Sequence, residues 1–468
     1  MLNYIRSLWA RRMTYVSGAS MATHAFELET RSNETRSNET RSDETLKTRT
    51  PLSRNLTRPV RLVVFLEQDS LAGGGYQQAK NAALLVKKLP ASLCNVVFVT
   101  TRESSVEDLR RSGIEAVYFP MRRWRRLATS LRVKLTHMAP FSVLNNPAKL
   151  NAIDRFLGTL KADLVYFTNP SQLALLTEHF NYLFTVWDLS HRDEVEFPEV
   201  RIRREFERRE VLYQSALKKA SGIFVDSVAG KDNVVRRYCI DSDRVHVIPF
   251  SPAVGILLSD DEYAQGYIDI KAKYQLTSDY VYYPAQFWPH KNHVYLLRGL
   301  RSLEDKFGIR LGAVFSGRDF GNKTYVHSIA ADLGLDDRVV FTGFVPDDEI
   351  PYLYRQAVAL VMPTYFGPTN LPPLEAFKLG VPVLYSDLTA LRDQVGDAGV
   401  LLDLNDPGSM ADGLHEIMTQ PEFRMQLIER GRQRIEALGD AGRLATLHEA
   451  IERFQARKMC WGSSIWTG

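Results

Sequence analysis

The sequence predicts an α/β fold with two doubly wound, Rossmann-like domains that face each other across a cleft. Three observations predict it. Thirteen short runs of β-branched and apolar residues follow one another, and they are apolar on both faces. A stretch of helical character separates each run from the next. The rhythm breaks at SPAVGILLSDDEY (residues 251–263), which divides the runs into seven and six.

The runs give the order of the expected strands. In the first half they are RLVVFL (61–66), NVVFVT (95–100), AVYFP (116–120), LVYFTN (164–169), LFTVWD (183–188), GIFVDS (222–227) and VHVIPF (245–250). In the second half they are YVYYPA (280–285), LGAVFSG (311–317), VVFTGF (339–344), ALVMPT (359–364), VPVLYS (381–386) and GVLLDL (399–404). Ligands of such sheets bind outside the carboxyl ends of the strands, so two facing domains suit a reaction in which each domain holds one substrate.

The expected division of the chain follows from these runs. It comprises a disordered extension at 1–58, a first Rossmann-like domain at 59–252, a linker at 253–277, a second Rossmann-like domain at 278–435, and a C-terminal helix and tail at 436–468.

The composition is that of a globular protein with a nearly neutral body. Of the 468 residues, 45% are hydrophobic and 24% are charged, and no apolar run reaches the roughly eighteen residues that a membrane span needs. Residues 1–58 carry ten Lys and Arg against six Asp and Glu, which leaves 49 of each sign for residues 59–468. This balance argues against a general polyanion-binding surface, including one for nucleic acid.

The three cysteines are scattered along the chain. Cys94, Cys239 and Cys460 form neither a disulfide framework nor a zinc pattern. We expect Cys94 and Cys239 to be buried thiols, which fits a reducing cytoplasm.

The first 58 residues have the composition of a disordered extension. TRSNETRSNETRSDET (30–45) repeats five polar residues and has nothing apolar to bury. Its N-x-T triplets would carry a glycan only in a secretory compartment. MLNYIRSLWARRMTYV (1–16) is basic and mildly amphipathic and lacks the apolar centre of a signal peptide. It is either a segment that touches a membrane or an extension upstream of a start at Met21.

The segment PTYFGPTNLPPLEAFKLGVPV (363–383) follows an expected strand and precedes another. We expect a loop stiffened by Pro372 and Pro373, and then a helix LEAFKLG that ends at Gly380. The amino end of that helix would offer free N–H groups to a phosphate. Glu375, in its first turn, would accept hydrogen bonds from sugar hydroxyls. The alternative is an acid that only stabilises its own helix dipole.

This segment resembles the donor domain of retaining glycosyltransferases of family 4, which have the two-domain GT-B architecture. Their motif is E-G-F-G-L-P-x-x-E-A-x-x-x-G-x-P-V, and Leu371–Val383 is similar to its second part. The resemblance implies that Glu375 binds the ribose of a nucleotide. The first glutamate of the motif falls on Gly367, within FGPTN, so the usual contact on the sugar side is missing. The candidates to replace it are Thr369, Asn370 and Leu371.

Two further passages carry the same resemblance, which extends over about 278–405. YYPAQFWPHKNHVYLL (282–297) is similar to the passage in which an Arg and a Lys neutralise the pyrophosphate. Lys291 falls on the Lys and Gln286 falls near the Arg, and His290 or His293 would compensate for the missing charge. In the third passage the turn at Gly343–Val345 lies close to the base. The donor-site residues expected from these passages and the preceding glycine turn are Lys291, Gln286, Gly317, Phe344 and Val345.

The first domain has two candidate segments for the acceptor side. Gly73, Gly74 and Gly75 form a glycine loop that opens a helix, and they lack the spacing of a dinucleotide fingerprint. By the resemblance this loop faces the cleft; the alternative is a plain strand–helix turn. VWDLSHRDEVEFP (186–198) is similar to a D-x-x-H segment of the family, which implies that Asp188 and His191 point into the cleft as catalytic residues. The alternative for His191 is a structural histidine.

RRWRRLATSLRVKL (122–135) predicts a basic amphipathic helix. Its basic and interfacial residues suit an anionic membrane surface; the alternative is a basic helix packed on its own domain. The membrane-facing candidates are Arg122, Arg123, Trp124, Arg125 and Arg126.

Taken with the resemblance, these features predict a retaining glycosyltransferase that uses a nucleotide-diphosphate sugar and a glycan or lipid-linked acceptor. It would need no bound metal or other cofactor, bind no nucleic acid, and act in the cytoplasm or on the inner face of the cell membrane, in surface polysaccharide synthesis. The rival functions are a GT-B sugar-nucleotide epimerase and a degenerate nucleotide-sugar-binding protein.

Overall fold

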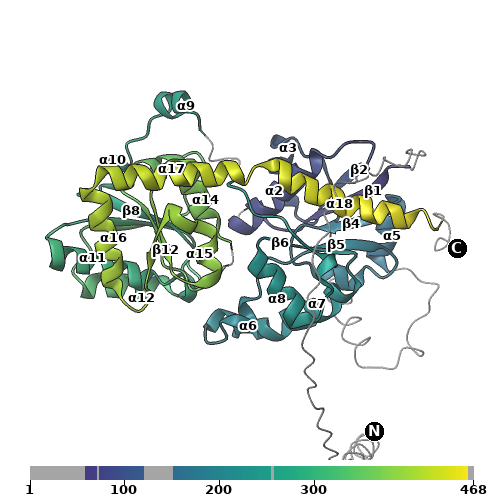
Figure 1. The fold of residues 1–468 in the computed structure, drawn as a ribbon, viewed down its shortest axis with the longest axis horizontal. Helices are drawn as coiled ribbons and strands as arrows, with labels where there is room; N and C mark the ends of the chain where they lie inside the picture. Colours follow the sequence, from purple (N-terminus) through teal and green to yellow (C-terminus); the bar gives the residue numbers. More distant parts are fainter. Residues whose placement is uncertain (1–57, 71–72, 121–150, 254–257, 368, 462–468) are drawn as a thin grey trace, which may run out of the picture. The chain divides into compact units, whose positions relative to one another are not determined.

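Two parallel β-sheets form the framework of the chain (Figure 1). The computed structural model describes residues 58–70, 73–120, 151–253, 258–367 and 369–461. The first sheet has seven strands in the order β3-β2-β1-β4-β5-β6-β7. They are β1 (Val60–Leu66), β2 (Cys94–Thr100), β3 (Ala116–Tyr118), β4 (Leu164–Phe167), β5 (Asn181–Thr185), β6 (Gly222–Val225) and β7 (Val245–Val247).

The second sheet has six strands in the order β10-β9-β8-β11-β12-β13. They are β8 (Tyr280–Pro284), β9 (Gly312–Ser316), β10 (Val339–Gly343), β11 (Leu360–Met362), β12 (Val383–Ser386) and β13 (Gly399–Leu402). This order matches the first six positions of the other sheet. In each sheet, successive strands are added first on one side of the first strand and then on its other side. The switch points therefore lie between β1 and β4 and between β8 and β11. Ligands of doubly wound sheets bind at such switch points, outside the carboxyl ends of the strands.

The predicted fold class is confirmed, because each of the thirteen runs overlaps one strand and every pairing in both sheets is parallel. Burial explains why the runs are apolar on both faces. All four residues of β4 and all five of β9 are buried, because helices cover both sides of each sheet.

The helices alternate with the strands. In the first half they are α2 (Gly74–Lys87), α3 (Val106–Arg111), α5 (Ala152–Thr159), α6 (Ser190–Asp193), α7 (Glu205–Lys219) and α8 (Val228–Tyr238). The second half has α9 (Asp260–Gln265), α10 (Ile270–Tyr274), α11 (His293–Phe307), α12 (Lys323–Asp332), α13 (Ile350–Arg355), α14 (Leu371–Lys378), α15 (Thr389–Val395), α16 (Pro407–Thr419), α17 (Pro421–Ala437) and α18 (Asp440–Lys458). The 3₁₀ turns are η2 (Glu103–Ser105), η3 (Gln172–Leu176), η4 (Pro198–Val200), η5 (Ile202–Arg204), η6 (Ser242–Arg244), η8 (Pro289–Lys291) and η9 (Gly396–Ala398).

The last helix packs on the first domain. Leu447, Ile451 and Phe454 of α18 belong to the same buried cluster as apolar residues of β1 and α2. Helix α17 packs on α14 and α16 of the second domain instead. The first domain is therefore completed by a segment from the far end of the sequence (Figure 1).

One burial prediction for the cysteines is wrong. Cys94 is buried, and burial raises its pKa to about 11. Cys239 is exposed, because it follows the last turn of α8 in a left-handed conformation with φ of 53°.

Other sequence predictions lie outside the described residues. They include the pentapeptide repeat and the basic segment 122–135 with Arg122, Arg123, Trp124, Arg125 and Arg126. Among the described residues, no helix is both long enough and apolar enough to cross a bilayer.

Candidate functional site

Lys291 ends the short 3₁₀ turn η8, which follows the central strand β8 of the second sheet. The Tyr283 hydroxyl donates to the Lys291 carbonyl at 2.8 Å, and the Lys291 ammonium donates to Oδ1 of Asn370 at 3.1 Å. No carboxylate oxygen of the described residues lies within 4.0 Å of this ammonium. Burial lowers the pKa of Lys291 to about 8, although the charges of Asp188 and Glu199 oppose this shift. The result is a half-buried cation that lacks an ion-pair partner within the described chain.

Asn370 holds the loop that faces this cation. Its side-chain amide donates to the Gly367 carbonyl at 2.9 Å and to the Tyr385 hydroxyl at 2.6 Å. Its backbone N–H donates to Gln394 at 3.0 Å, and Gln394 donates in return to the Asn370 carbonyl at 2.6 Å. The loop is therefore fixed by side chains from β12 and α15, and the orientation of Asn370 towards Lys291 is set in advance.

Helix α14 begins three residues earlier than the sequence predicts. It starts at Leu371, so Pro372 and Pro373 occupy its first turn and do not precede it. Proline has no N–H, and the N–H of Asn370 is taken by Gln394. The expected row of free amides at this helix end is therefore wrong, because only Leu371 among the first three residues has an N–H to give.

Glu375 lies beyond the first turn of α14, which corrects its predicted position. The alternative of an acid that stabilises its own helix dipole is not supported, because that interaction falls off after the first turn. The carboxyl is buried and accepts a hydrogen bond from the Tyr354 hydroxyl at 2.8 Å. Burial raises the pKa of Glu375 to about 7, although the hydrogen bonds from Tyr354 and the Ala253 backbone lower it. Asn370 directly precedes the helix, so the backbone of Glu375 lies five residues further on, about 7.5 Å along the helix axis.

The glycine loop of the first domain lies beside the donor-site candidates. A side chain on Gly73 would approach Nε2 of Gln286 to 3.4 Å, and one on Gly74 would approach Leu371 to 3.6 Å. A side chain on Gly75 would contact Trp187 at 3.2 Å. The amino end of α2, a helix of fourteen residues with no side-chain cap, therefore opens next to β8 and α14. Its free N–H groups can serve an anion in place of those missing from α14.

Some of the remaining donor-site candidates are accessible to a ligand, and others only pack within the protein. Gln286 accepts a hydrogen bond from the Trp288 indole at 3.2 Å and carries no charge. Gly317 is a packing position, since a Cβ there would lie 2.4 Å from the Ala285 carbonyl oxygen. In the turn after β10, the side chain of Phe344 is 65% exposed, whereas Val345 is buried. Phe344 is thus accessible to a ligand, and Val345 anchors the turn.

The histidines do not replace the missing arginine. His290 donates from its backbone to Glu199 at 3.1 Å, and its ring stacks on Phe366 with centroids 3.7 Å apart. Burial lowers the pKa of His290 to about 4 and that of His293 to about 3. The ring of His290 is moreover bound to the Glu199 carboxylate, with Nδ1 2.5 Å from Oε1, so the prediction that these histidines compensate for Gln286 is not supported.

Gly367 cannot carry the acid that the motif has at this position. Its φ is +110°, a conformation that side-chain-bearing residues rarely adopt. A Cβ there would also lie 2.8 Å from Oδ1 and 2.9 Å from Nδ2 of Asn370. The loop conformation that places Asn370 against Lys291 therefore excludes a glutamate at 367.

A cavity of about 710 Å³ adjoins this loop. The first domain lines it with the segments after β5 and β6, and the second domain with the loop before α14 and the start of α15. Its polar lining includes Asp188, Ser190, Asp193, Asp226 and Thr389. Lys291 and Glu375 do not line this cavity, although Gly367 does.

Asp188 reaches the cavity but is held firmly. It accepts hydrogen bonds from the Ser190 backbone at 2.9 Å and from the Arg209 guanidinium at 2.5 Å. Burial alone raises the pKa of Asp188, but Arg209 and Ser190 outweigh it and lower the pKa to about 2. Asp188 is therefore an ionised, ion-paired carboxylate at the rim of the cavity.

His191 does not point into the cleft, so this prediction is wrong. Its side chain has no exposed surface and packs against Phe206 and Tyr213. Its Nε2 is bonded to Glu210 at 2.8 Å, and Glu210 is also bound by Arg192. Burial lowers the pKa of His191 to about 4. This is the structural histidine of the alternative interpretation.

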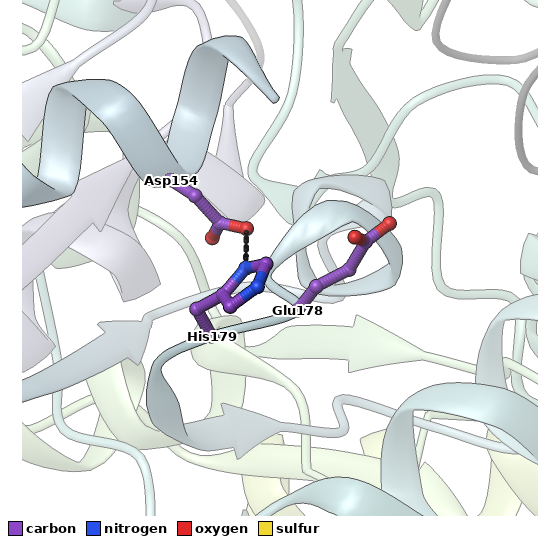
Figure 2. Close-up of side chains that lie close together, drawn as sticks. All are labelled: Asp154, Glu178 and His179. Atoms are coloured by element: carbon purple, nitrogen blue, oxygen red, sulfur yellow. Dashed lines mark hydrogen bonds and ion pairs between the residues drawn. The ribbon is translucent and has the colours of Figure 1, made fainter. Parts of the chain in front are cut away.

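A separate group of side chains has the composition of a metal site. Asp154, Glu178 and His179 place potential ligand atoms within 4.8 Å of one another (Figure 2). Nδ1 of His179 is bonded to Asp154 at 2.8 Å, and Asn151 donates to the same carboxylate oxygen at 2.9 Å. This pairing accounts for the proximity of the groups, and two of the three residues are exposed. We assign no metal to it.

Sequence reasoning missed Asp226, Arg209 and Glu199. For Asp226 a signal existed, because it directly follows the run GIFV, as Asp188 closely follows LFTV. An acid at the carboxyl end of a buried parallel strand lies where ligands bind. Arg209 and Glu199 had no such signal, since they come from a helix and a turn far along the chain from their partners.

Comparison with known proteins agrees with this arrangement. Residues 268–434 match the family described as "Glycosyl transferases group 1". The chain is 26% identical over 276 residues to O-antigen chain mannosyltransferase B of Escherichia coli, covering 57% of this chain and 66% of that protein. It is 23% identical over 212 residues to O-antigen chain mannosyltransferase RfbU of Salmonella typhimurium strain LT2, covering 45% of this chain and 55% of that protein. These alignments span less than two thirds of either relative.

Among solved structures, the fold is similar to that of Anabaena Alr3699/HepE in complex with UDP and glucose. The TM-score is 0.63 at 15% identity, with 84% of this chain and all of that chain covered. Residues 268–434 thus match the glycosyltransferase group 1 family, and the two sheets together have the fold of GT-B proteins.

Proposed function

We propose that this protein is a retaining glycosyltransferase that moves a sugar from a nucleotide-diphosphate donor to a hydroxyl of a glycan or lipid-linked glycan. The observation that carries the proposal is the half-buried ammonium of Lys291, which has no ion-pair partner among the described residues and which Asn370 holds at the start of α14. A partly desolvated cation that has only a neutral partner is unfavourable in the free protein, and an anionic ligand would compensate it.

The diphosphate would lie between Lys291 and the amino end of α2. Negative charge grows on the diphosphate as its bond to the sugar breaks, and a fixed cation stabilises this charge without rearrangement. The Leu371 N–H and the glycine loop add neutral donors close by. Glu375 would accept hydrogen bonds from the ribose, as the family resemblance implies.

Mannose is the first sugar to test, because both relatives described above are named O-antigen chain mannosyltransferases. A role in surface polysaccharide synthesis follows from the same names. The UDP and glucose of the Anabaena structure make UDP-glucose the second donor to test. Retention of configuration and independence of a bound metal stay parts of this proposal.

The test is a thermal-shift panel of GDP, GDP-mannose, UDP and UDP-glucose, followed by a transfer assay with extracted lipid-linked glycans. We expect one nucleotide family to raise the melting temperature and its sugar to be transferred with retained anomeric configuration. Activity should persist in EDTA. Product analysis by NMR separates transfer from epimerisation, which would change the donor and leave the acceptor unmodified.

Failure has distinct forms. If no nucleotide shifts the melting temperature of the wild type, the donor site is wrong. If nucleotide sugars bind but neither transfer nor hydrolysis follows with any acceptor, the degenerate binding protein is favoured, and Gly367 and Gln286 are the departures that favour it.

A further inference from the structure

Asp226 lines the cavity that also borders Gly367, the position at which the motif's first acid is absent. It directly follows β6, and the strand beside it, β5, leads to Asp188. Asp188, Asp226 and Gly367 all line the cavity of about 710 Å³. Asp226 is 3% exposed, so its carboxyl group is almost entirely removed from bulk water.

One oxygen of this carboxyl group is free to accept a hydrogen bond. Oδ1 receives the Ser227 hydroxyl at 3.1 Å, whereas buried Oδ2 has no hydrogen-bond partner among the described residues. Most buried polar atoms have a partner, so an unsatisfied carboxylate oxygen on a cavity wall indicates a missing ligand group. Gly230 packs closely against the other oxygen, since a Cβ there would lie 3.0 Å from Oδ1.

Two neighbouring acids of the first domain, Asp188 and Asp193, already have ion-pair partners. Asp188 is held by Arg209, and Asp193 by Arg237. In contrast, burial raises the pKa of Asp226 to about 7, although hydroxyls of Thr369 and Ser227 lower it. Thr369 belongs to the FGPTN loop, so Asp226 lies against the loop from which the motif's first acid is absent.

We propose that Asp226 supplies, from the first domain, the carboxylate that accepts a hydrogen bond from a hydroxyl of the transferred sugar. This inference rests on the proposed function and concerns the sugar-side half of the same site. It replaces the acid that the backbone at Gly367 excludes. A sugar hydroxyl would donate to Oδ2, and no covalent bond to Asp226 forms or breaks.

The role predicts selective loss of sugar recognition. A group that contacts only the sugar affects the affinity for the nucleotide sugar and leaves the affinity for the nucleoside diphosphate unchanged. A structural role would affect both. The ratio of the two dissociation constants, measured on one sample, is therefore the readout, and any loss of folded protein cancels in it.

The experiment is calorimetric titration of the full chain with GDP and GDP-mannose, and with UDP and UDP-glucose, in the wild type and in Asp226→Asn. We expect the ratio for the bound pair to change about tenfold, the loss of one good hydrogen bond to a buried carboxylate. Asp241→Asn, at an exposed aspartate outside the cavity, is the matched control and should keep the wild-type ratio.

A second variant guards against poor folding of the first. Thr369→Val keeps the shape of the loop and removes the hydroxyl beside Asp226, so we expect a ratio change of about two- to threefold in the same direction. An unchanged ratio in both variants overturns the inference.

This result is distinguishable from failure of the proposed function. If the wild type binds none of the four probes, the proposed function fails. If the wild type binds and transfers, and Asp226→Asn lowers both affinities equally, only the role of Asp226 fails.

Discussion

Asp188 and His191 of the first domain have charged partners, whereas Lys291 and Glu375 of the second domain have only neutral ones. In the first domain, Asp188 is bound by Arg209, and His191 is bonded to a Glu210 that Arg192 also holds. In the second domain, Lys291 has an amide oxygen as its partner, and Glu375 has a tyrosine hydroxyl. The pKa values follow this difference: Asp188 falls to about 2, whereas Glu375 rises to about 7 and Lys291 falls to about 8.

This difference distinguishes charged groups that stabilise the fold from charged groups that a bound ligand would compensate. A buried charge with a full partner stabilises its surroundings, and removal of the partner is costly. A buried charge with only a neutral partner is a cost to the folded state, and a ligand of opposite charge offsets that cost. Titratable groups with strongly shifted pKa values gather at functional sites, but here compensation is the better criterion.

Substitution of Lys291 should have the largest effect and tests this difference most directly. In Lys291→Ala we expect a turnover about 10³-fold lower and no thermal stabilisation by nucleoside diphosphate, because the leaving group loses its fixed cation. In Lys291→Met, the ligand-free protein should be as stable as the wild type or more stable, because a half-buried charge without an ion-pair partner is gone. Steady-state kinetics and differential scanning fluorimetry measure both.

Lys306→Ala is the control, since Lys306 is a surface residue paired with Asp412. A Lys291→Met variant that melts far below the wild type and keeps its nucleotide shift would contradict the assignment of an unpaired ligand-binding cation.

Substitution of Arg209 should have the opposite effect: it should lower the stability of the protein and leave nucleotide affinity nearly unchanged. In Arg209→Leu, Asp188 loses its ion-pair partner, and we expect a loss of about 2–3 kcal/mol of unfolding free energy, the low end for a buried pair because Asp188 is partly exposed. Affinity for the nucleotide should change less than about threefold. Urea unfolding at pH 7 measures the first, and calorimetric titration the second.

Arg208→Leu is a matched control on the same helix. Arg208 pairs with Glu205 at the surface, so its removal should cost less than about 1 kcal/mol. Equal losses in the two variants would show that the Arg209 pair is no better compensated than a surface pair.

The third test uses the pH dependence of stability. The folded-state pKa values of Glu375 and Asp226 are both raised to about 7. Their contribution is therefore fully present below their unfolded values near 4, and it is lost as pH rises to about 7. We expect unfolding free energy to fall with rising pH in this window, by at most about 1.4 kcal/mol per pH unit for each group.

Urea unfolding at pH 5, 6, 7 and 8 measures this slope, and the double variant Glu375→Gln, Asp226→Asn should flatten it. Asp188 has the opposite sign, since its depressed pKa makes stability fall only when pH drops below about 4. A slope that the double variant leaves unchanged would contradict the raised pKa values.

The smallest expected effect is on nucleotide affinity in Glu375→Gln. Tyr354 can still donate to the amide oxygen, so the fold should persist, and affinity for a nucleoside diphosphate should fall about tenfold, or about 1.4 kcal/mol. Affinity for inorganic pyrophosphate, which has no ribose, should stay the same in calorimetric titration. Glu429→Gln on the exposed face of α17 is the control, and equal weakening of both ligands would exclude a ribose contact.

The fold was predictable because parallel strands covered by helices leave an unambiguous pattern. Every run from RLVVFL to GVLLDL overlaps a strand, since most of these strands, such as β4 and β9, are buried on both faces and the sequence records that directly. The GT-B fold came from the resemblance of the residues around Glu375. Position along a helix was less predictable: two prolines suggested a stiff approach, yet Pro372 and Pro373 fit the first turn, where a missing N–H costs little.

The site was only partly predictable, because burial and pairing are properties of the fold. The D-x-x-H spacing gave no means of telling that Asp188 would reach the cavity and His191 would turn inward to Glu210. The exclusion of an acid at Gly367 depends on a φ angle and on the position of Asn370, neither of which a sequence motif records. The roles of Lys291, Glu375 and the glycine loop stay predictions.

Helix α18 has a consequence for how the chain matures. Residues Leu447, Ile451 and Phe454 complete a core that β1 begins nearly four hundred residues earlier. During synthesis on the ribosome, part of the apolar surface of the amino-terminal sheet therefore stays exposed until the last segment emerges. A chain cut short before residue 440 would lose this cover, and it would be the first domain, not the nearer second one, that becomes prone to aggregate.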